Sequence, residues 1–323
     1  MNQNIKIAKE LVKLAKILVA DESIGSLTDR PTVEDFFFPR DLERGEKEAQ
    51  NFLRRYPFYI VKYPKIRDIF ADNLYERWAY DILKVYPSFI DDYPEIMAEF
   101  SGMIENGLGQ DILKDNLSLI EKCPSIRSAF AKSLAYGNGY DILKDNVSWI
   151  DKYPEIKDRI AEGIKNKKID EDFLKNNLSL FEKYPEMRDS FVEILKKGSA
   201  GTSIVEFDFS LLDKYPEISD AFVEGLKYEM IYAWAKDFVV KNSFLLDKYP
   251  ELGEALVERI KIDLKYHSDY YLRKYPFLFE KYPEIRNAYI ECFLKKGMGL
   301  DFLDKYPKFK KYPELKPYLH VFN

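Results

Sequence analysis

The chain has 323 residues and a net charge of −5 at pH 7, with 46% hydrophobic and 33% charged residues. The 24 Tyr and 23 Phe argue against a disordered chain, and 13 Val with 3 Thr are too few for an all-β protein. The acidic balance argues against non-specific binding to nucleic acid, and with two His and two Cys we predict no catalytic, cofactor-binding or metal-binding residues.

The first predicted element is an amphipathic helix over residues 1–20. Four apolar residues fall on one stripe at helical spacing: Ile7, Leu11, Leu14 and Leu18. Lysines occupy other faces of this helix, at Lys6, Lys9, Lys13 and Lys16. The stripe either docks on a partner or on an anionic membrane surface, or it covers the first repeat of the region that follows. We assign its four apolar residues as a partner-docking site.

The sequence contains no predicted targeting or membrane-spanning segment. The lysines in residues 1–20 interrupt the apolar run that a signal peptide needs, and no stretch approaches the ~20 apolar residues that span a bilayer. Cys123 and Cys292 lie far apart in the sequence, as expected of reduced thiols. We therefore expect a cytoplasmic protein, or a virion protein if the source is viral.

A repeated motif, Lys-Tyr-Pro-Glu-Ile, dominates the rest of the chain. Its Tyr recurs in eight copies and Cys123 replaces it in a ninth: Tyr63, Tyr93, Tyr153, Tyr184, Tyr215, Tyr249, Tyr282 and Tyr312. The nine positions are 30, 30, 30, 31, 31, 34, 33 and 30 residues apart. A unit of this length cannot bury an apolar face alone, so neighbouring units must stack on one another.

Each motif predicts a long helix that begins at its Pro. Proline suits the first helical position, and the Glu that follows it is favoured by the helix dipole. Apolar residues then recur at intervals of four, which places them on one helical face, as in Ile126/Phe130/Leu134 and Ile156/Ile160/Ile164.

A shorter helix is expected after each long one. Gly-x-Gly segments such as Gly107–Gly109 should end the long helix, and an Asp should cap the next, as at Asp111, Asp141 and Asp301. A short apolar turn such as Leu117–Ile120 then leads to the next motif. Each unit is therefore predicted to be a long helix, a short helix and a turn.

Two stretches interrupt this pattern. Residues 21–55 contain Gly25, Pro31 and Pro39 and indicate an irregular linker or an N-terminal cap. Within the repeat region, 56–323, residues 198–209 lack the usual connection and precede the two longest spacings. We expect a hinge at 198–209.

The sequence thus predicts an all-α fold, a right-handed α-solenoid of about nine repeats of 30–34 residues with an N-terminal amphipathic helix. This organisation resembles that of HEAT-like and variant leucine-rich solenoids. The resemblance implies a fold and no particular activity, because the repeated motif matches no specific family among them.

The function favoured by a uniform repeat is a non-enzymatic scaffold that binds a protein or peptide. The Tyr residues of the motif, which we call the Tyr column, could stack on nucleic-acid bases. Each of them directly precedes the Pro that starts a helix, and Cys123 replaces one of them. Both observations favour the interpretation that these rings pack between helices. One alternative is a structural component of a larger assembly docked through residues 1–20, which are similar to amphipathic leaders of tailed-phage structural proteins. The other is a nucleic-acid-processing enzyme on helical repeats, as some DNA glycosylases are.

Overall fold

The computed structural model describes residues 50–51, 53–198, 201–266, 268–296 and 298–319. Helices are the only regular secondary structure in these residues, which confirms the all-α prediction. The chain forms two compact units, unit 1 (Met1–Phe173) and unit 2 (Leu174–Asn323). The predicted helix at 1–20 and residues 21–49 lie outside the described residues, and the hinge at 198–209 stays a prediction.

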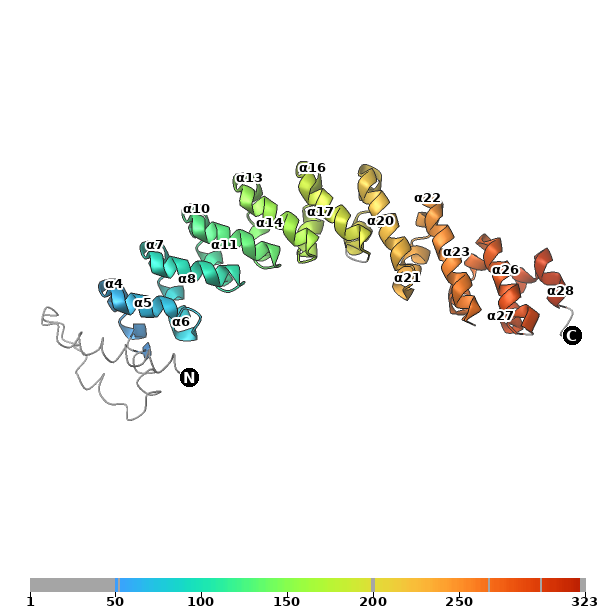
Figure 1. Ribbon diagram of the computed structural model, residues 1–323, viewed down its shortest axis with the longest axis horizontal. Helices are drawn as coiled ribbons and strands as arrows, with labels where there is room; N and C mark the ends of the chain where they lie inside the picture. Colours follow the sequence, from blue (N-terminus) through green and yellow to red (C-terminus); the bar gives the residue numbers. More distant parts are fainter. Residues whose placement is uncertain (1–49, 52, 199–200, 267, 297, 320–323) are drawn as a thin grey trace, which may run out of the picture. The chain divides into compact units, whose positions relative to one another are not determined.

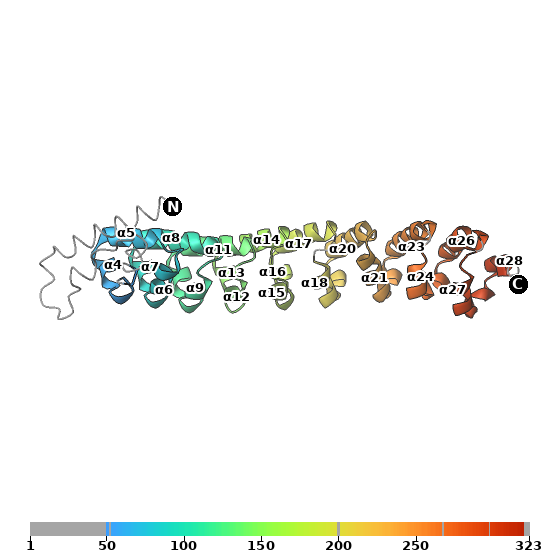
Figure 2. The same ribbon diagram turned by 90° about the horizontal axis from the view of Figure 1, so that it is seen from below.

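Unit 1 repeats a short, a long and a short helix in that order (Figure 1). Its helices are α4 (Phe58–Lys62), α5 (Pro64–Asp72), α6 (Arg77–Val85), α7 (Ser88–Asp92), α8 (Pro94–Glu105), α9 (Gln110–Asp115), α10 (Ser118–Lys122), α11 (Pro124–Ala135), α12 (Tyr140–Leu143), α13 (Trp149–Lys152), α14 (Pro154–Lys165) and the start of α15 (Glu171–Asn176). Figure 2 shows the long helices α5, α8, α11 and α14 in one row and the short helices α6, α9 and α12 in another.

Unit 2 has the same order of helices, and two of its long helices, α20 and α23, are longer than those of unit 1. Its elements are α16 (Leu180–Lys183), α17 (Pro185–Lys196), α18 (Thr202–Phe207), α19 (Ser210–Lys214), α20 (Pro216–Glu229), α21 (Ala233–Lys241), α22 (Phe244–Lys248), α23 (Pro250–Lys265), α24 (Tyr270–Lys274), α25 (Phe277–Lys281), α26 (Pro283–Cys292), η1 (Leu294–Lys296), α27 (Leu300–Lys305), η2 (Pro307–Lys311), η3 (Pro313–Leu315) and α28 (Lys316–Leu319).

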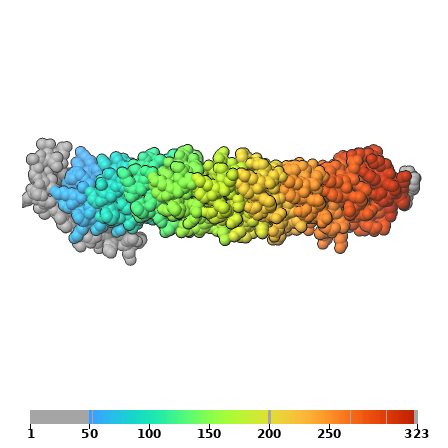
Figure 3. Space-filling model, turned by 90° about the horizontal axis from the view of Figure 1, so that it is seen from above, coloured from blue at the N-terminus to red at the C-terminus, as the bar shows by residue number. Residues whose placement is uncertain are grey.

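The core of each unit lies between successive long helices. In unit 1 these contacts join α5 to α8, α8 to α11 and α11 to α14, and in unit 2 they join α17 to α20, α20 to α23 and α23 to α26. The predicted apolar rows are buried, for example Ile126/Phe130/Leu134 and Leu252/Leu256/Ile260. Within each unit, the side chains of successive repeats are in contact along the face seen in Figure 3. The prediction that neighbours bury each other's apolar rows is therefore confirmed within each unit.

The long helices begin and end as the sequence predicts. Tyr153 is extended (φ −129°, ψ 99°) because the following Pro154 disfavours a helical residue before it, and Pro154 is the first residue of α14. A left-handed Gly follows α8, α11 and α17, with φ of 80° at Gly107, 93° at Gly137 and 110° at Gly198. After α14 the same place holds Lys167, whose φ is 59°.

The predicted apolar turn before each motif is wrong, because the structure has a helix there. Asn116 leaves the helical conformation after α9 (φ −133°, ψ 55°), and its carbonyl oxygen accepts the N–H of Leu119 at 3.0 Å to open α10. Its side-chain Nδ2 donates to the carbonyl oxygen of Ile112 at 2.8 Å, which terminates the preceding helix. Leu119 and Ile120 of α10 are buried, so core packing favours a helical turn over an open one.

The predicted caps at Asp111, Asp141 and Asp301 are also wrong. The N-cap residues of α9, α12 and α27 are the left-handed Gly109, Gly139 and Gly299, without a side-chain cap hydrogen bond. Asp111 lies one residue inside α9, where it accepts hydrogen bonds from Lys84 Nζ at 2.7 Å and from the Tyr80 hydroxyl. The acidic side chain therefore joins two repeats and does not cap its own helix.

The Tyr column packs between helices. Tyr153, Tyr184 and Tyr215 are buried, and Tyr63, Tyr93, Tyr249, Tyr282 and Tyr312 are partly buried. The three buried rings do not present free faces for stacking on bases.

Lys167 offers a direct test of how the long helices end. A non-glycine residue in the left-handed region costs about 1 kcal/mol, so we expect Lys167→Gly to stabilise unit 1 by about 0.5–1 kcal/mol. The adjacent Lys168, whose φ is not positive, is the matched control, and Lys168→Gly should destabilise by a few tenths of a kcal/mol. Thermal melting and hydrogen exchange of the α14 amides measure both. Equal effects of the two substitutions would contradict this account.

Candidate interaction surface

An arginine of one long helix joins its repeat to the next. Arg127 donates from Nε to Glu155 Oε1 at 2.7 Å and from Nη1 to the carbonyl oxygen of Ile120 at 3.2 Å. Its guanidinium carbon lies 4.4 Å from the centre of the Tyr153 ring, a cation–π contact. We call this set, an Arg with the Tyr and Glu of the following motif, an arginine clasp. Further clasps in the described residues are Arg67–Tyr93–Glu95, Arg188–Tyr215–Glu217 and Arg286–Tyr312–Glu314.

The clasp residues are replaced together where Cys123 stands in the Tyr position. Met97 occupies the place of the Arg, and Ser125 that of the Glu. The Cys123 thiol donates to Asp91 Oδ1 at 3.0 Å. Burial, and then this hydrogen bond, raises the pKa of the Cys123 thiol to about 11. The thiol stays protonated at neutral pH, so it is a packing residue and not an activated nucleophile.

A second row of ion pairs lies at the surface of the repeats. The Lys before a Tyr-Pro pairs with an acid of the preceding repeat: Lys152 with Glu121 at 2.9 Å, Lys214 with Glu182 at 2.7 Å, Lys248 with Asp213 at 2.5 Å and Lys281 with Asp247 at 2.6 Å. Exposed pairs of this kind contribute little stability individually. In these ion pairs and in the clasps, the charged side chains that recur most regularly form contacts between repeats.

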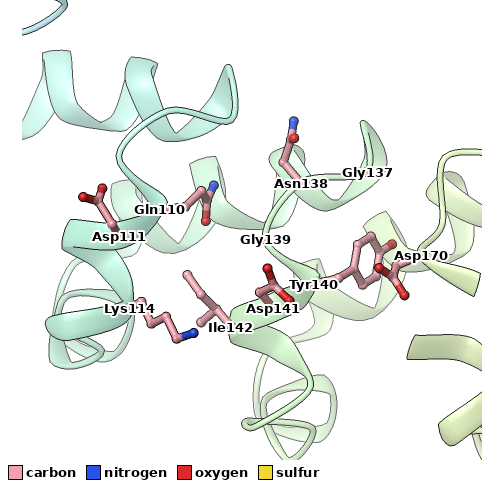
Figure 4. A pocket seen from close by; sticks show the side chains of 10 residues that line it. All are labelled: Gln110, Asp111, Lys114, Gly137, Asn138, Gly139, Tyr140, Asp141, Ile142 and Asp170. Atoms are coloured by element: carbon pink, nitrogen blue, oxygen red, sulfur yellow. The ribbon is translucent and has the colours of Figure 1, made fainter. Parts of the chain in front are cut away.

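A pocket of about 420 Å³ in unit 1 is the first candidate for a chemical site (Figure 4). Asp111, Asp141 and Asp170 line it, from three successive short-helix regions. Asp141 accepts a hydrogen bond from Lys144 at 2.9 Å, and Asp170 accepts one from the backbone N–H of Phe173 at 2.7 Å. Each of the three carboxylates therefore already has a structural partner.

The electrostatics of this pocket do not provide a general acid. Burial alone would raise the pKa of Asp111, but hydrogen bonds from Lys84 and Tyr80 outweigh it and lower the pKa. The hydrogen bond from Lys144 lowers the pKa of Asp141. No group of three or more His, Cys, Asp or Glu side chains in the described part of the chain is placed to hold a metal ion. The pocket is therefore a joint between repeats.

Unit 2 carries rows of acidic side chains on two of its long helices. On α20, Asp220 and Glu224 are exposed and one turn apart, and Glu254 and Glu258 stand in the equivalent places on α23. Like charges at this spacing destabilise a helix by a few tenths of a kcal/mol. Among the described residues, Asp220 and Glu254 form no salt bridge. Glu224 pairs with Lys196 of α17 at 4.0 Å, and Glu258 pairs with Lys261 on its own helix at 2.6 Å.

Exposed apolar side chains extend both acidic rows. Tyr228 follows Glu224 by one turn and is 67% exposed, and Ile262 follows Glu258 and is 40% exposed. The ends of α20 and α23 and the loops after them add further exposed residues: Ile231, Tyr232, Tyr266 and Tyr270. The helices α20 and α23 pack against one another, and both groups of exposed side chains lie at or after the C-terminal ends of these two helices.

A groove of about 310 Å³ is formed by side chains of α20 and α23. It is lined by Asp220, Val223, Glu224 and Lys227 of α20 and by Glu251 of α23, and Lys227 directly precedes Tyr228. Its lining holds three acids and one lysine. We call the acidic rows, the groove and the exposed apolar ends of α20 and α23 the unit 2 surface.

The sequence did not identify this surface. The predicted docking residues Ile7, Leu11, Leu14 and Leu18 lie outside the described residues. The signal for the unit 2 surface was the pair of long spacings, 34 and 33 residues. They reflect α20 and α23, which have 14 and 16 residues where α8, α11, α14 and α17 have 12.

Comparison of the chain with protein-family models, curated proteins and solved structures found no match. In the part of the chain that the structure describes, no helix combines the length and apolar character needed to cross a bilayer.

The arginine clasp predicts a measurable loss when its arginine is removed. We expect Arg127→Met, which copies Met97 of α8, to destabilise the α11–α14 junction by about 1–2 kcal/mol, because charge-assisted hydrogen bonds and a cation–π contact are lost. Arg159→Met is the matched control, since Arg159 on α14 forms an exposed pair with Glu162 and should change stability by less than about 0.5 kcal/mol. Hydrogen exchange of the α11 and α14 amides measures both, and equal losses would contradict a special role for the clasp.

The clasps also predict how stability depends on pH. The hydrogen bond from Arg67 lowers the pKa of Glu95 below its ordinary 4.5. A carboxylate whose pKa is lower in the folded state than in the unfolded state stabilises the fold at every pH above its unfolded-state pKa. This stabilisation is lost as the pH falls through the folded-state pKa. Glu95→Gln should therefore lower the melting temperature at neutral pH. The difference from the wild type should shrink as the pH falls below 4.5 and vanish once the pH is below the folded-state pKa of Glu95. Glu99→Gln, on the same helix outside the clasp, is the control. A difference that stays constant with pH would be the contrary result.

Proposed function

We propose that the protein is a non-enzymatic scaffold that binds a protein or peptide through the unit 2 surface. The supporting observation is the group of exposed Tyr and Ile side chains at the ends of α20 and α23. Aromatic residues, Tyr among them, are enriched at protein interfaces and supply much of the binding energy there. Scattered exposed apolar residues are ordinary, but residues gathered at two packed helices indicate a binding region.

The charge of the unit 2 surface favours a basic partner. Asp220, Glu224 and Glu251 line the groove, and Glu254 and Glu258 extend along α23. Opposite charges around an apolar centre direct association and select the partner. The same acids would repel phosphates, so this region does not favour the alternative of a nucleic-acid-processing enzyme.

The proposal includes the finer predictions made from the sequence. These are a right-handed α-solenoid of about nine repeats, organised like HEAT-like or variant leucine-rich solenoids, and a location in the cytoplasm or in a virion. Stacked repeats of this kind present rows of equivalent side chains, which suits the binding of an extended or helical segment.

Paired tyrosine substitutions test the proposal. The full-length protein, the variant Tyr228→Ser/Tyr266→Ser and the control Tyr136→Ser serve as baits in extracts of the native source, with cross-linking and quantitative mass spectrometry. Tyr136 is the matched control because it is 66% exposed, against 67% for Tyr228, and follows its motif at the same distance in unit 1.

We expect one defined partner to be captured by the wild type and by Tyr136→Ser, and to bind the double variant at least about tenfold more weakly when purified. Equal capture by all three proteins would place binding elsewhere on the chain. Capture of no partner, with turnover of a small molecule instead, would overturn the scaffold proposal.

A further inference from the structure

Building on the proposed function, we propose that the groove between α20 and α23 binds an arginine side chain of the basic partner. The guanidinium takes the place that the arginine of a clasp has at other junctions, on the carboxylate of Glu251 and beside the ring of Tyr249. The existence of a partner rests on the proposed function, whereas the choice of arginine rests on the clasps within this chain.

The four clasps of the described residues show what the Tyr and the Glu of a motif bind. In each clasp the arginine pairs through Nε with the Glu, and its guanidinium lies over the Tyr ring. In the last of them, Arg286 Nε is 2.6 Å from Glu314 Oε1, and the guanidinium carbon is 4.2 Å from the centre of the Tyr312 ring. The Lys of the same motif also lies near the ring, as Lys311 does at 5.5 Å from the Tyr312 ring.

The junction of α20 and α23 has the Tyr and the Glu of a clasp without the arginine. Ser219 stands in the place of the arginine, and its Oγ donates a hydrogen bond to the Tyr249 hydroxyl oxygen at 2.8 Å. Within the described residues, Lys248 is the one cation over the Tyr249 ring, at 5.4 Å from its centre. Glu251 forms no salt bridge in the same part of the chain. The carboxylate that binds a guanidinium elsewhere is therefore unpaired here.

The groove borders this unpaired carboxylate. Helices α20 and α23 (Figure 1) pack less extensively than α11 and α14, and the space of about 310 Å³ between them is lined by Glu251. This volume lies at the lower end of the range for ligand pockets, about 300–1,000 Å³. Asp220, Glu224 and Lys227 complete the charged lining, so acids outnumber cations. Carboxylates beside an aromatic ring favour a planar guanidinium over an ammonium group.

The other junctions that keep the Tyr and the Glu but lack the arginine differ from this one. Lys157 puts a cation in the place of the arginine before Tyr184. Gly253 stands in that place on α23, and a Cβ atom there would lie 3.0 Å from the Tyr282 hydroxyl oxygen. The tyrosine therefore fills the space of the missing side chain at α23 and α26. Among the described junctions, the one between α20 and α23 combines an unpaired Glu with an open groove.

Three blocked peptides test the site on the full-length protein. They are acetyl-Gly-Gly-Arg-Gly-Gly-amide and its counterparts with lysine and with citrulline, the neutral isostere of arginine. Val223 lines the groove, so its methyl resonances report binding in methyl NMR. The peptides are titrated over about 0.1–10 mM, the range expected for the affinity of a single side chain.

Two substitutions with matched controls identify the contacts. Glu251→Gln removes the unpaired carboxylate, and its control Glu254→Gln removes an acid of α23 that does not line the groove. Ser219→Arg supplies the missing arginine within the chain. Its control Ser219→Ala removes the hydrogen bond to Tyr249 and leaves the place of the arginine open. Circular dichroism melting verifies that each variant is folded.

We expect the arginine peptide to shift Val223 saturably and to bind at least about threefold more tightly than the lysine peptide, and the citrulline peptide to cause no shift. Glu251→Gln should weaken binding of the arginine peptide at least about tenfold, and Glu254→Gln less than about threefold. Ser219→Arg should abolish binding and raise the melting temperature by about 2–4 °C, because its own arginine completes the clasp. Ser219→Ala should bind like the wild type.

Three results would overturn the inference. One is a wild type that binds no arginine peptide, as when another segment or copy of this chain fills the groove. The second is equal binding of the arginine and citrulline peptides, and the third is binding that Glu251→Gln and Ser219→Arg leave unchanged.

Partner capture separates this inference from the proposed function. If the partner captured through Tyr228 and Tyr266 binds Ser219→Arg as tightly as the wild type, the scaffold proposal stands and the arginine site fails. If no partner is captured but the arginine peptide binds as expected, the arginine site stands and the scaffold proposal fails.

Discussion

The constraint on which the whole structure depends is that one repeat cannot cover its own apolar row. A row such as Ile126, Phe130 and Leu134 is buried because the long helices before and after α11 enclose it. Burial of each such side chain contributes about 1.5–3 kcal/mol, and no local interaction of a short helix is as large. The proline that starts each long helix, the left-handed residue that follows α8, α11, α14 and α17, and the arginine clasps all act to hold successive rows in register.

The long helices and their buried rows were predictable from the sequence because their causes are local. Proline, glycine and a four-residue apolar period determine where a helix begins, where it ends and which side it buries. The extra helix of each repeat was missed, although Tyr86-Pro87 and Tyr275-Pro276 precede two copies of it. The role of Asp111 was also missed, because its partners Tyr80 and Lys84 belong to another repeat. A sequence pattern does not show which side chains meet between units.

The unit 2 surface was hidden from the sequence for a related reason. A tyrosine-rich chain has many candidates for exposure, and whether one is buried depends on how far its helix extends beyond the neighbouring helices. Tyr153 is buried and Tyr228 is exposed, although both belong to repeats with the same motif. The extra residues of α20 and α23 appeared in the sequence only as two long spacings, to which we assigned a hinge. In a regular array, a repeat that is longer than the others has extra residues. These residues can form a surface that is not needed for stacking against the neighbouring repeats.

The joint replacement of the clasp residues at Met97, Cys123 and Ser125 has a consequence for how such an array can be altered. The arginine belongs to one repeat, and the tyrosine and glutamate belong to the next, so each clasp spans the boundary between two repeats. If a block of repeats is moved, duplicated or deleted, new neighbours come into contact at its two ends. These neighbours are compatible only when the boundaries at the two ends of the block are of the same type. The chain contains more than two kinds of boundary, because Lys157, Ser219 and Gly253 take the place of the arginine before motifs that keep their Tyr and Glu. The order of these boundaries restricts which rearrangements yield a folded product.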